Sequence, residues 1–394
     1  MILAAGTLAQ ASFSALSVGL PALAPALRSY YGLTLGETGV VLGAVGIGML
    51  FTLLPWGFLA DRISEQVVIA AGLTLAAGSL VLAGWTTSYA GIAFALFAAG
   101  AFGASVNAAS GRAVMGWFPA TQRGLALGVR QTAIPIGGAA AAAGLPWLND
   151  VGGTKLAFVV LGCSCLAGGL LALAFIRTPP AAGADLANLR GPMRDPRMWI
   201  LGLGAGMYLT AQIGITSFLV LFLHVHRGVS AHSAALLLAG INVLSIGARI
   251  LSGRWSDHVH TRLRPIRQIG VGLTATTALV AVCTDAPLSL LVPVLVVAGC
   301  LSMAWNGLAI AAAAETATGG RVGAAIGLQQ TLLGVLVAGV PPAFAAVAGS
   351  SWRLAFALAA AGPALGAIAL AYVPEPSRTR VRTPETSAIP PAAR

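Results

Sequence analysis

Three arginines lie within apolar stretches of this sequence, where a charged side chain is costly and usually functional: Arg112, Arg130 and Arg249. A guanidinium group is a planar fork of N–H donors that can bind a carboxylate or oxyanion through two parallel hydrogen bonds. Arg249 forms a polar stripe with Asn242 at helical spacing, about two turns inside the end of its segment. We therefore expect Arg249 to bind an anion. Arg130, beside Gln131, is the candidate for a second positive charge. The alternative to anion binding is that each arginine forms a gating ion pair or contacts the carbonyl groups at a helix end.

Uncharged polar side chains also recur inside the apolar segments. Gln10 in the first segment and Gln212 in the seventh each lie on a polar helical face, and Asn107 and Asn306 share faces with small residues. Such groups either line an aqueous cavity or hydrogen-bond neighbouring helices, and both readings stay open here. The candidate substrate-binding residues are Arg249, Arg130, Gln131, Asn107, Asn306, Gln330, Gln10, Gln212, Tyr208 and Asn242.

The composition indicates a membrane protein. Of 394 residues, 57% are hydrophobic and 8% charged, whereas soluble domains carry about 25% charged residues. The net charge of +11 would suggest a nucleic-acid partner in a soluble protein, but here the basic residues lie mostly in short loops, so we expect none. The four cysteines lie in apolar segments, and no metal cluster, nucleophile triad or phosphate loop is visible. We expect neither an enzyme nor a cofactor.

Twelve apolar segments are long enough to span a bilayer. Between the sixth and seventh lies a polar interruption, which divides the chain into an N-terminal bundle (1–176), a cytoplasmic linker (177–196), a C-terminal bundle (197–374) and a disordered cytoplasmic tail (375–394). The expected segments are 2–27, 36–59, 66–84, 89–115, 124–147, 155–176, 197–223, 232–252, 267–284, 287–313, 322–347 and 352–373.

The basic residues of the loops predict the orientation. With the N-terminus in the cytoplasm, fifteen loop or tail arginines fall on the cytoplasmic side, and four basic residues fall on the other. The positive-inside rule favours this arrangement. We expect a multi-pass protein of the plasma (inner) membrane with both termini in the cytoplasm.

The two bundles repeat one another in sequence. Five matches occur in the same order along the chain, more than chance supplies among apolar segments, and the small drift in spacing fits loop insertions. The polar matches are Asn107 with Asn306 and Gln131 with Gln330, both 199 residues apart, and Gln10 with Gln212, 202 apart. The predicted fold class is all-α transmembrane, a twelve-helix bundle of two six-helix pseudo-repeats.

The loop after the second segment reads Gly57-Phe-Leu-Ala-Asp61-Arg62, and a weaker copy, Gly253-Arg-Trp-Ser-Asp257, follows the eighth. These motifs resemble the major facilitator superfamily, and the resemblance covers nearly the whole chain. Where the family usually continues with basic residues, Ser64 and two further non-basic residues stand here. The resemblance implies transport by alternating access, with helices 1, 4, 7 and 10 around a central cavity.

The resemblance also implies a charged cytoplasmic latch that breaks and reforms as the halves rock. Arg112 is expected to pair with Asp61, and Asp257 belongs to the second copy. Ordinary surface charge is the alternative for Arg62, Arg254 and Arg321. The candidate gating residues are Asp61, Arg62, Arg112, Asp257, Arg254, Glu315 and Arg321.

The acidic residues favour one substrate class. All eleven lie in loops, tails or segment ends, and Glu37 follows Thr34 at the spacing of a helix cap. A carrier of lipophilic cations generally benefits from an embedded carboxylate, and none is evident. Anion-carrying family members have an arginine resembling Arg249 on helix 8. Nitrate porters have a second on helix 2, where Leu53 stands here, which argues against nitrate.

We therefore predict a monomeric, lipid-embedded symporter of a small anion, such as an organic carboxylate, that works by alternating access. A coupling proton is an open alternative, since no carboxylate relay is evident. Two further alternatives are multidrug efflux and a non-transporting receptor on the same scaffold. The first needs an apolar cavity without specific charges; the second would show no flux.

Overall fold

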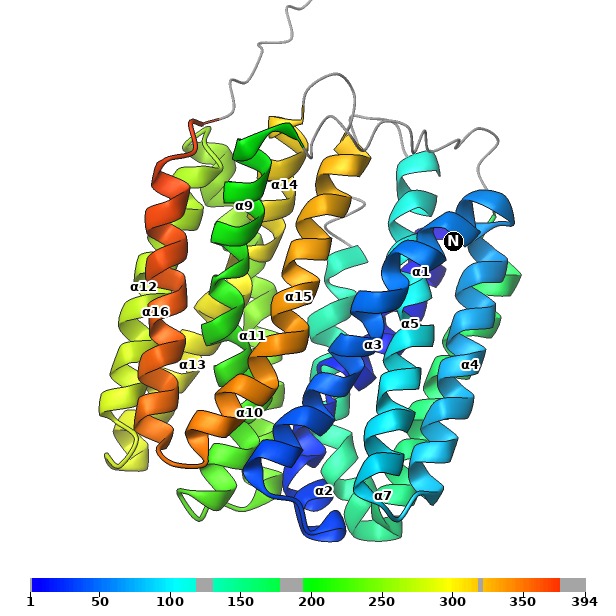
Figure 1. The fold of residues 1–394 in the computed structure, drawn as a ribbon, viewed down its shortest axis with the longest axis vertical. Coiled ribbons are helices and arrows are strands. Elements are labelled where there is room, and N and C mark those ends of the chain that lie inside the picture. Colours follow the sequence, from blue (N-terminus) through cyan, green and yellow to red (C-terminus); the bar gives the residue numbers. More distant parts are fainter. Residues whose placement is uncertain (1, 118–129, 178–193, 318–321, 376–394) are drawn as a thin grey trace, which may run out of the picture.

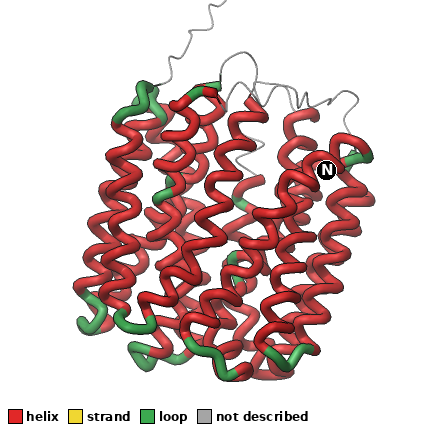
Figure 2. The backbone as a smooth tube through the Cα atoms, in the orientation of Figure 1, coloured by secondary structure: helices red, strands yellow, loops and turns green. Residues whose placement is uncertain are grey.

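The computed structural model describes residues 2–117, 130–177, 194–317 and 322–375. Throughout these ranges the chain is helical and contains no strand, which confirms the predicted fold class (Figures 1 and 2). The helices of the N-terminal half are α1 (Ile2–Ser17), η1 (Leu20–Leu23), α2 (Ala24–Tyr31), α3 (Leu35–Arg62), α4 (Glu65–Trp85), α5 (Tyr89–Trp117) and α7 (Ala133–Phe175). Those of the C-terminal half are α9 (Pro196–Gly206), α10 (Tyr208–Val225), α11 (Ala231–His258), α12 (Leu263–Val282), α13 (Leu288–Ala304), α14 (Asn306–Thr316), α15 (Val322–Ala348) and α16 (Trp352–Ala371).

The helices account for twelve membrane crossings. Eleven runs in the described residues are long and apolar enough to span a bilayer, and one of them, α7, has 43 residues. A straight helix of that length would measure about 65 Å, twice the ~30 Å hydrocarbon core. The chain breaks helical geometry at Gly152 and at Gly153, whose φ of +69° is a left-handed conformation that glycine adopts without steric cost. The α7 helix is therefore two crossings joined by a tight turn.

The first, seventh and tenth crossings are each one apolar span, as we expect from the sequence, but each contains a local irregularity. The first passes from α1 to α2 through the short 3-10 helix η1, the seventh changes helix at Met207, and the tenth changes at Trp305. The Thr210 hydroxyl lies beside the break at Met207 and donates to the Met207 carbonyl at 2.9 Å. Interrupted membrane helices of this kind are common where transporters bind substrates and ions.

The α3 helix starts at Leu35 with a capping box. The Thr34 hydroxyl accepts a hydrogen bond from the Glu37 backbone N–H at 3.2 Å, and the Glu37 carboxylate accepts one from the Thr34 N–H at 2.8 Å. This confirms that Glu37 is a helix cap.

Two hydrophobic cores fill the molecule. One is built from residues of the N-terminal half, including Phe13 and Phe158. The other is built almost entirely from the C-terminal half around Trp305 and Phe356. The division at 1–176, 177–196 and 197–374 stays a prediction, and residues 178–193 and 376–394 lie outside the described residues.

The two halves pack closely at one end of the bundle and diverge toward the other. We call the end where α1 begins the upper end and the opposite end, where α3 begins, the lower end (Figure 1). Near the lower end, a methyl group added to Gly39 of α3 would lie 2.3 Å from Cβ of Ala345 on α15, and one added to Gly46 would lie 2.8 Å from Val337. Toward the upper end, a methyl group on Gly57 or Gly327 would meet nothing within 4 Å. The α3 and α15 helices thus close the lower end and separate above it.

Candidate functional site

Polar side chains of α1, of α5 and of the helical residues 130–131 just before α7 form one connected cluster in the N-terminal half. Gln10 donates from Nε2 to Oδ1 of Asn107 at 2.9 Å. Arg130 donates from Nη1 to Oε1 of Gln10 at 3.2 Å and to the hydroxyl of Ser110 at 3.0 Å. The Gln10 amide is therefore held between the charged and the uncharged member of the cluster.

The C-terminal half carries the matching pair. Asn306, the first residue of α14, donates from Nδ2 to Oε1 of Gln212 on α10 at 3.3 Å. The break at Trp305 immediately precedes Asn306, so its amide lies at the start of a half-helix within the tenth crossing. The sequence repeat thus brings Gln10 to Asn107 and Gln212 to Asn306.

Arg249 connects the two halves. From α11 its Nη1 donates to the backbone carbonyl of Gln131, two residues before α7, at 3.4 Å. Both neighbouring candidate residues therefore belong to the contacts of this site, Arg130 through its side chain and Gln131 through its backbone carbonyl. The Nε atoms of Arg130 and Arg249 are buried and have no hydrogen-bond partner in the structure.

The charge on these two arginines is not neutralised by a described acid. Every ion pair shown by the described residues lies near a helix end, at Asp257, Asp285, Glu315 or Glu375. The Arg249 guanidinium group thus contacts the carbonyl of Gln131, and both it and Arg130, the chain neighbour of Gln131, keep an unused donor. This arrangement can bind an anion.

Asn242 lies at the seam between the halves. Its side chain is fully buried, with Nδ2 donating to the Leu238 carbonyl at 3.0 Å and Oδ1 without a partner. A methyl group added to Gly138 of α7 would lie 3.1 Å from that Oδ1. Asn242 therefore faces the opposite half on the same helix as Arg249.

Two predicted binding residues lie apart from this set. Tyr208 is buried in the core of the C-terminal half, where its hydroxyl donates to the Ile266 carbonyl of α12 at 3.0 Å and its ring packs edge-on against Trp305. Tyr208 and Gln212 lie four residues apart on α10, but Tyr208 is fully buried in the core, whereas Gln212 bonds to Asn306. Gln330 is exposed on α15.

The upper end of the C-terminal half holds an ion-pair cluster centred on Arg262, which we did not predict. Arg262 donates from Nε to Glu315 at 2.9 Å and from Nη1 to Asp257 at 2.7 Å. Two predicted gating residues, Glu315 and Asp257, therefore meet through a third. Arg254 and Arg62 are exposed at helix ends. The side chains of Asp61 and Arg112, and all of Arg321, lie outside the described residues.

Glu375, also not predicted, extends this cluster by capping α12. Its carboxylate accepts hydrogen bonds from the backbone N–H groups of Leu263 at 3.2 Å and Arg264 at 2.9 Å, and pairs with Arg267 at 3.4 Å. A carboxylate here satisfies unpaired helix N–H groups and complements the positive end of the helix dipole. The segment after α16 is thereby fixed to α12.

The model for the Major Facilitator Superfamily matches residues 2–340 of the chain. This chain belongs to the major facilitator superfamily. An uncharacterised MFS-type transporter of Mycobacterium tuberculosis is 31% identical to it over 372 residues, covering 92% of this chain and 83% of that protein. Members of the superfamily are membrane transporters, and the chain is a transporter, not an enzyme.

Two further similarities extend this comparison. A probable sulfoacetate transporter of Cupriavidus necator is 23% identical over 270 residues, covering 64% of this chain and 63% of that protein. The crystal structure of a bacterial homolog of Spinster, a human lysosomal transporter, in an inward-facing and occupied conformation, has a TM-score of 0.74 at 19% identity, covering 94% and 95% of the two chains. That structure shares the major facilitator fold.

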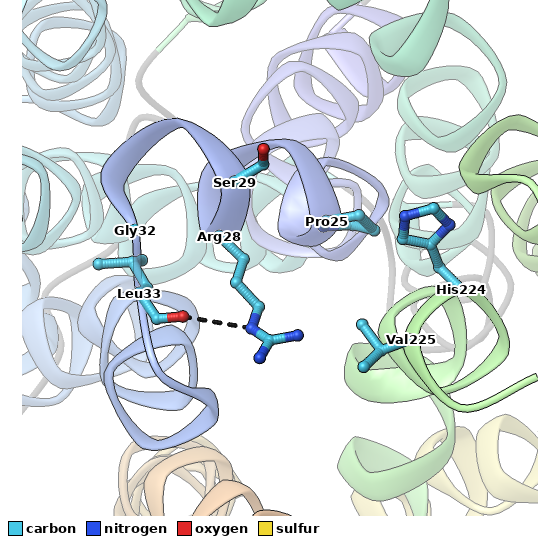
Figure 3. Close-up of a pocket in the computed structure, with 7 residues that line it drawn as sticks. All are labelled: Pro25, Arg28, Ser29, Gly32, Leu33, His224 and Val225. Carbon is cyan, nitrogen blue, oxygen red and sulfur yellow. Dashed lines mark hydrogen bonds between the residues drawn. The ribbon is translucent and has the colours of Figure 1, made fainter. Parts of the chain in front are cut away.

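A shallow pocket lies between the halves of this major facilitator protein at the lower end (Figure 3). Arg28 of α2 donates from Nε to the Leu33 carbonyl at 3.2 Å, and its guanidinium group points into the space between α2 and α10. His224 at the end of α10 lines the other side and bonds the Val229 carbonyl through Nδ1 at 2.9 Å. The pocket marks where the two halves meet at the closed end.

Proposed function

We propose that this transporter carries a small organic anion, with Arg249 and Arg130 as its charged binding groups. The observation that carries the proposal is that Arg249 of the C-terminal half contacts the carbonyl of Gln131, the chain neighbour of Arg130. Each arginine has a buried Nε without a partner, and no described carboxylate is paired to either. A buried positive charge is costly unless an opposite charge is present. An anion supplies that charge, and its oxygens match the forked donors of arginine.

The uncharged residues would orient the substrate. Gln10 and Asn107 stand beside Arg130, and Gln212 and Asn306 form the matching pair in the other half. Amide groups can donate and accept, so they suit the uncharged oxygens of an organic anion. Gln131, Asn242 and Gln330 are further proposed members, whereas Tyr208 uses its hydroxyl within the core.

Alternating access would follow from the relative motion of the halves. The Arg249 contact to Gln131 crosses between them at a long 3.4 Å, so it can be exchanged for a substrate contact. The upper end is the cytoplasmic side in our proposed orientation, in which both termini lie in the cytoplasm of the plasma membrane. With the lower end closed, the structure would then face the cytoplasm. The proposed gate at the upper end comprises Asp61, Arg62, Arg112, Asp257, Arg254, Glu315 and Arg321, with Arg262 now added.

A relative supports an acidic substrate. The probable sulfoacetate transporter of Cupriavidus necator aligns with about two thirds of this chain, at 23% identity over 270 residues. Sulfoacetate is a small organic molecule with two acidic groups. Its chemistry fits a site with two arginines.

The proposal is tested by tracer flux in sealed proteoliposomes. The purified protein should accumulate or exchange a labelled anion such as sulfoacetate or succinate, and Arg249→Ala should abolish the flux. Arg249→Lys is the matched control for charge without the fork, and we expect it to lose most of the flux. Runs with and without an inward pH gradient test proton coupling. If lipophilic cations were transported equally well by the native protein and by Arg249→Ala, multidrug efflux would replace the proposed function. If no compound were transported, a receptor would be favoured.

A further inference from the structure

Gln329 on α15 is a buried amide without a partner. Its side chain is 1% exposed, and neither Oε1 nor Nε2 has a hydrogen bond in the structure. Among the described residues it is the side chain with two buried polar atoms left unpaired. Burying an amide without hydrogen bonds is costly, so a second group must satisfy it at some stage of the protein's work.

The internal repeat shows which role the position has in the other half. Gln329 lies 199 residues after Arg130, the spacing that also relates Gln330 to Gln131 in the same segments. Arg130 donates to Gln10 and to the Ser110 hydroxyl. In the C-terminal half, Gln212 is present and already accepts from Asn306.

The counterpart of Ser110 explains why Gln329 is left unpaired. At the spacing of 199 that relates Asn107 to Asn306, Ser110 corresponds to Ala309, a buried residue without a hydroxyl. The two halves therefore present different chemistry at equivalent positions. The N-terminal half has a charged guanidinium group with internal partners, and the C-terminal half has a neutral amide with none.

We infer that Gln329 binds an uncharged hydroxyl or carbonyl group of the transported anion, while the arginines bind its charged group. This inference rests on the proposed anion transport and narrows the substrate class to hydroxy- or keto-carboxylates. An amide fits a hydroxyl group because each can donate and accept. Since Gln329 is covered in this conformation, the contact forms when α15 has moved. Pro341 and Pro342 remove two backbone donors within α15 and make it a helix that can bend.

The test compares ligands that differ by one hydroxyl group. Lactate is paired with propionate and malate with succinate, and dissociation constants come from the concentration dependence of thermal stabilisation of the purified protein. In the native protein we expect the hydroxylated ligand to bind at least about tenfold more tightly, because a polar site rejects the analogue that leaves it unpaired. In Gln329→Met, which keeps the length of the side chain, the ratio should fall to about one while propionate or succinate binding is unchanged.

Thr277→Val is the matched control. Thr277 is a fully buried α12 residue whose hydroxyl also has no partner, and it lies outside the proposed site. It should keep the hydroxyl preference. Gln329→Leu serves as the second variant should the methionine variant fail to fold.

Two results would overturn the inference: a native protein that binds each ligand pair equally, or a Gln329 variant that keeps the native preference. The second result would mean that Gln329 is satisfied by a buried water or by the protein alone. Absence of binding by all carboxylates, together with indifference to Arg249→Ala, would instead remove the proposed function itself.

Discussion

Gln10 on α1 donates to Asn107 on α5 at 2.9 Å, and the residues that match them in the repeat, Gln212 and Asn306, bond to each other as well, at 3.3 Å. The direction of the bond is reversed, since Asn306 is the donor in the second pair. The repeat is thus preserved as a contact between the first and fourth crossings of each half. It differs in its third member, because Gln10 of the first pair also bonds to Arg130, whereas Gln329, the counterpart of Arg130, has no hydrogen bond to the second pair.

Removal of the N-terminal amide pair should be more destabilising than removal of its counterpart. Asn107→Leu removes a 2.9 Å bond and leaves Gln10 Nε2 only a long 3.5 Å contact to the Ser14 hydroxyl. Asn306→Leu breaks a longer bond, of 3.3 Å. We expect a loss of about 1 kcal/mol for Asn107→Leu and less for Asn306→Leu, as for other hydrogen bonds between membrane helices. Denaturant titration of the purified protein measures both. Equal losses, or no loss at Asn107, would show that the bond contributes nothing distinctive.

The close packing of α3 on α15 should control which end of the transporter is closed. Gly39→Leu places a side chain where even a methyl group would lie 2.3 Å from Ala345. We expect it to separate the helices at the lower end and to shift the population toward the state open there. Distances between spin labels at the lower ends of α3 and α15 would report the change. Gly57→Leu is the control, since nothing lies within 4 Å of a methyl group at that site. Unchanged distances in Gly39→Leu would contradict this account of the closure.

Glu375 should stabilise the start of α12. Its carboxylate accepts hydrogen bonds from the backbone N–H groups of Leu263 and Arg264, so Glu375→Ala removes the partner of both N–H groups. We expect a loss of about 1 kcal/mol, typical of a helix cap, and a lower melting temperature. Glu375→Gln should lose less, because the amide oxygen still accepts. An alanine variant that melts with the native protein would show that the segment after α16 is not held by this contact.

Acidification should weaken the lower end of the C-terminal half. The hydrogen bond from His226 holds the pKa of the Asp285 carboxyl below its usual value, and Arg353 acts in the same direction. A lowered pKa means that the contribution to stability is complete above the unfolded pKa of about 4 and is lost as pH falls through the folded value. The melting temperature of the native protein should therefore exceed that of Asp285→Asn at pH 6, and the two should converge below pH 4. A difference that is constant with pH would show that the carboxylate charge is irrelevant.

The fold class could be predicted from the sequence, and so could the polar residues that we propose for the site, but not the contacts among them. Apolar length located the crossings, and the spacing of Thr34 and Glu37 identified a cap. The repeat matched Gln10 with Gln212 and Asn107 with Asn306, but the bonds of Gln10 to Asn107 and of Asn306 to Gln212 were found only in the structure. Hydropathy could not reveal the breaks at Met207 and Trp305, because both residues continue an apolar helix by composition. Helical phase could not reveal that Tyr208 lies in the core, because that depends on how α10 packs against α12 and Trp305.

Two residues that we did not predict, Arg262 and Gln329, escaped prediction for other reasons. Arg262 is one of many basic residues near the upper end, and only three-dimensional placement shows that it joins Asp257 to Glu315. Gln329 matches Arg130 at the repeat spacing of 199, so the repeat does predict it as a candidate. We named only its exposed neighbour Gln330, which matches Gln131. Comparing the two halves residue by residue would have found it.

Ligand-induced thermal stabilisation tests the anion proposal most directly, with the native protein beside Arg249→Ala. The panel holds small carboxylates, sulfonates and inorganic oxyanions together with lipophilic cations, and binding to the native state raises the melting temperature. We predict that one class of organic anion stabilises the native protein and that Arg249→Ala abolishes the shift, since Arg249 presents a buried Nε without a partner at the junction of the halves. Stabilisation by lipophilic cations alone, unchanged in Arg249→Ala, would contradict anion transport.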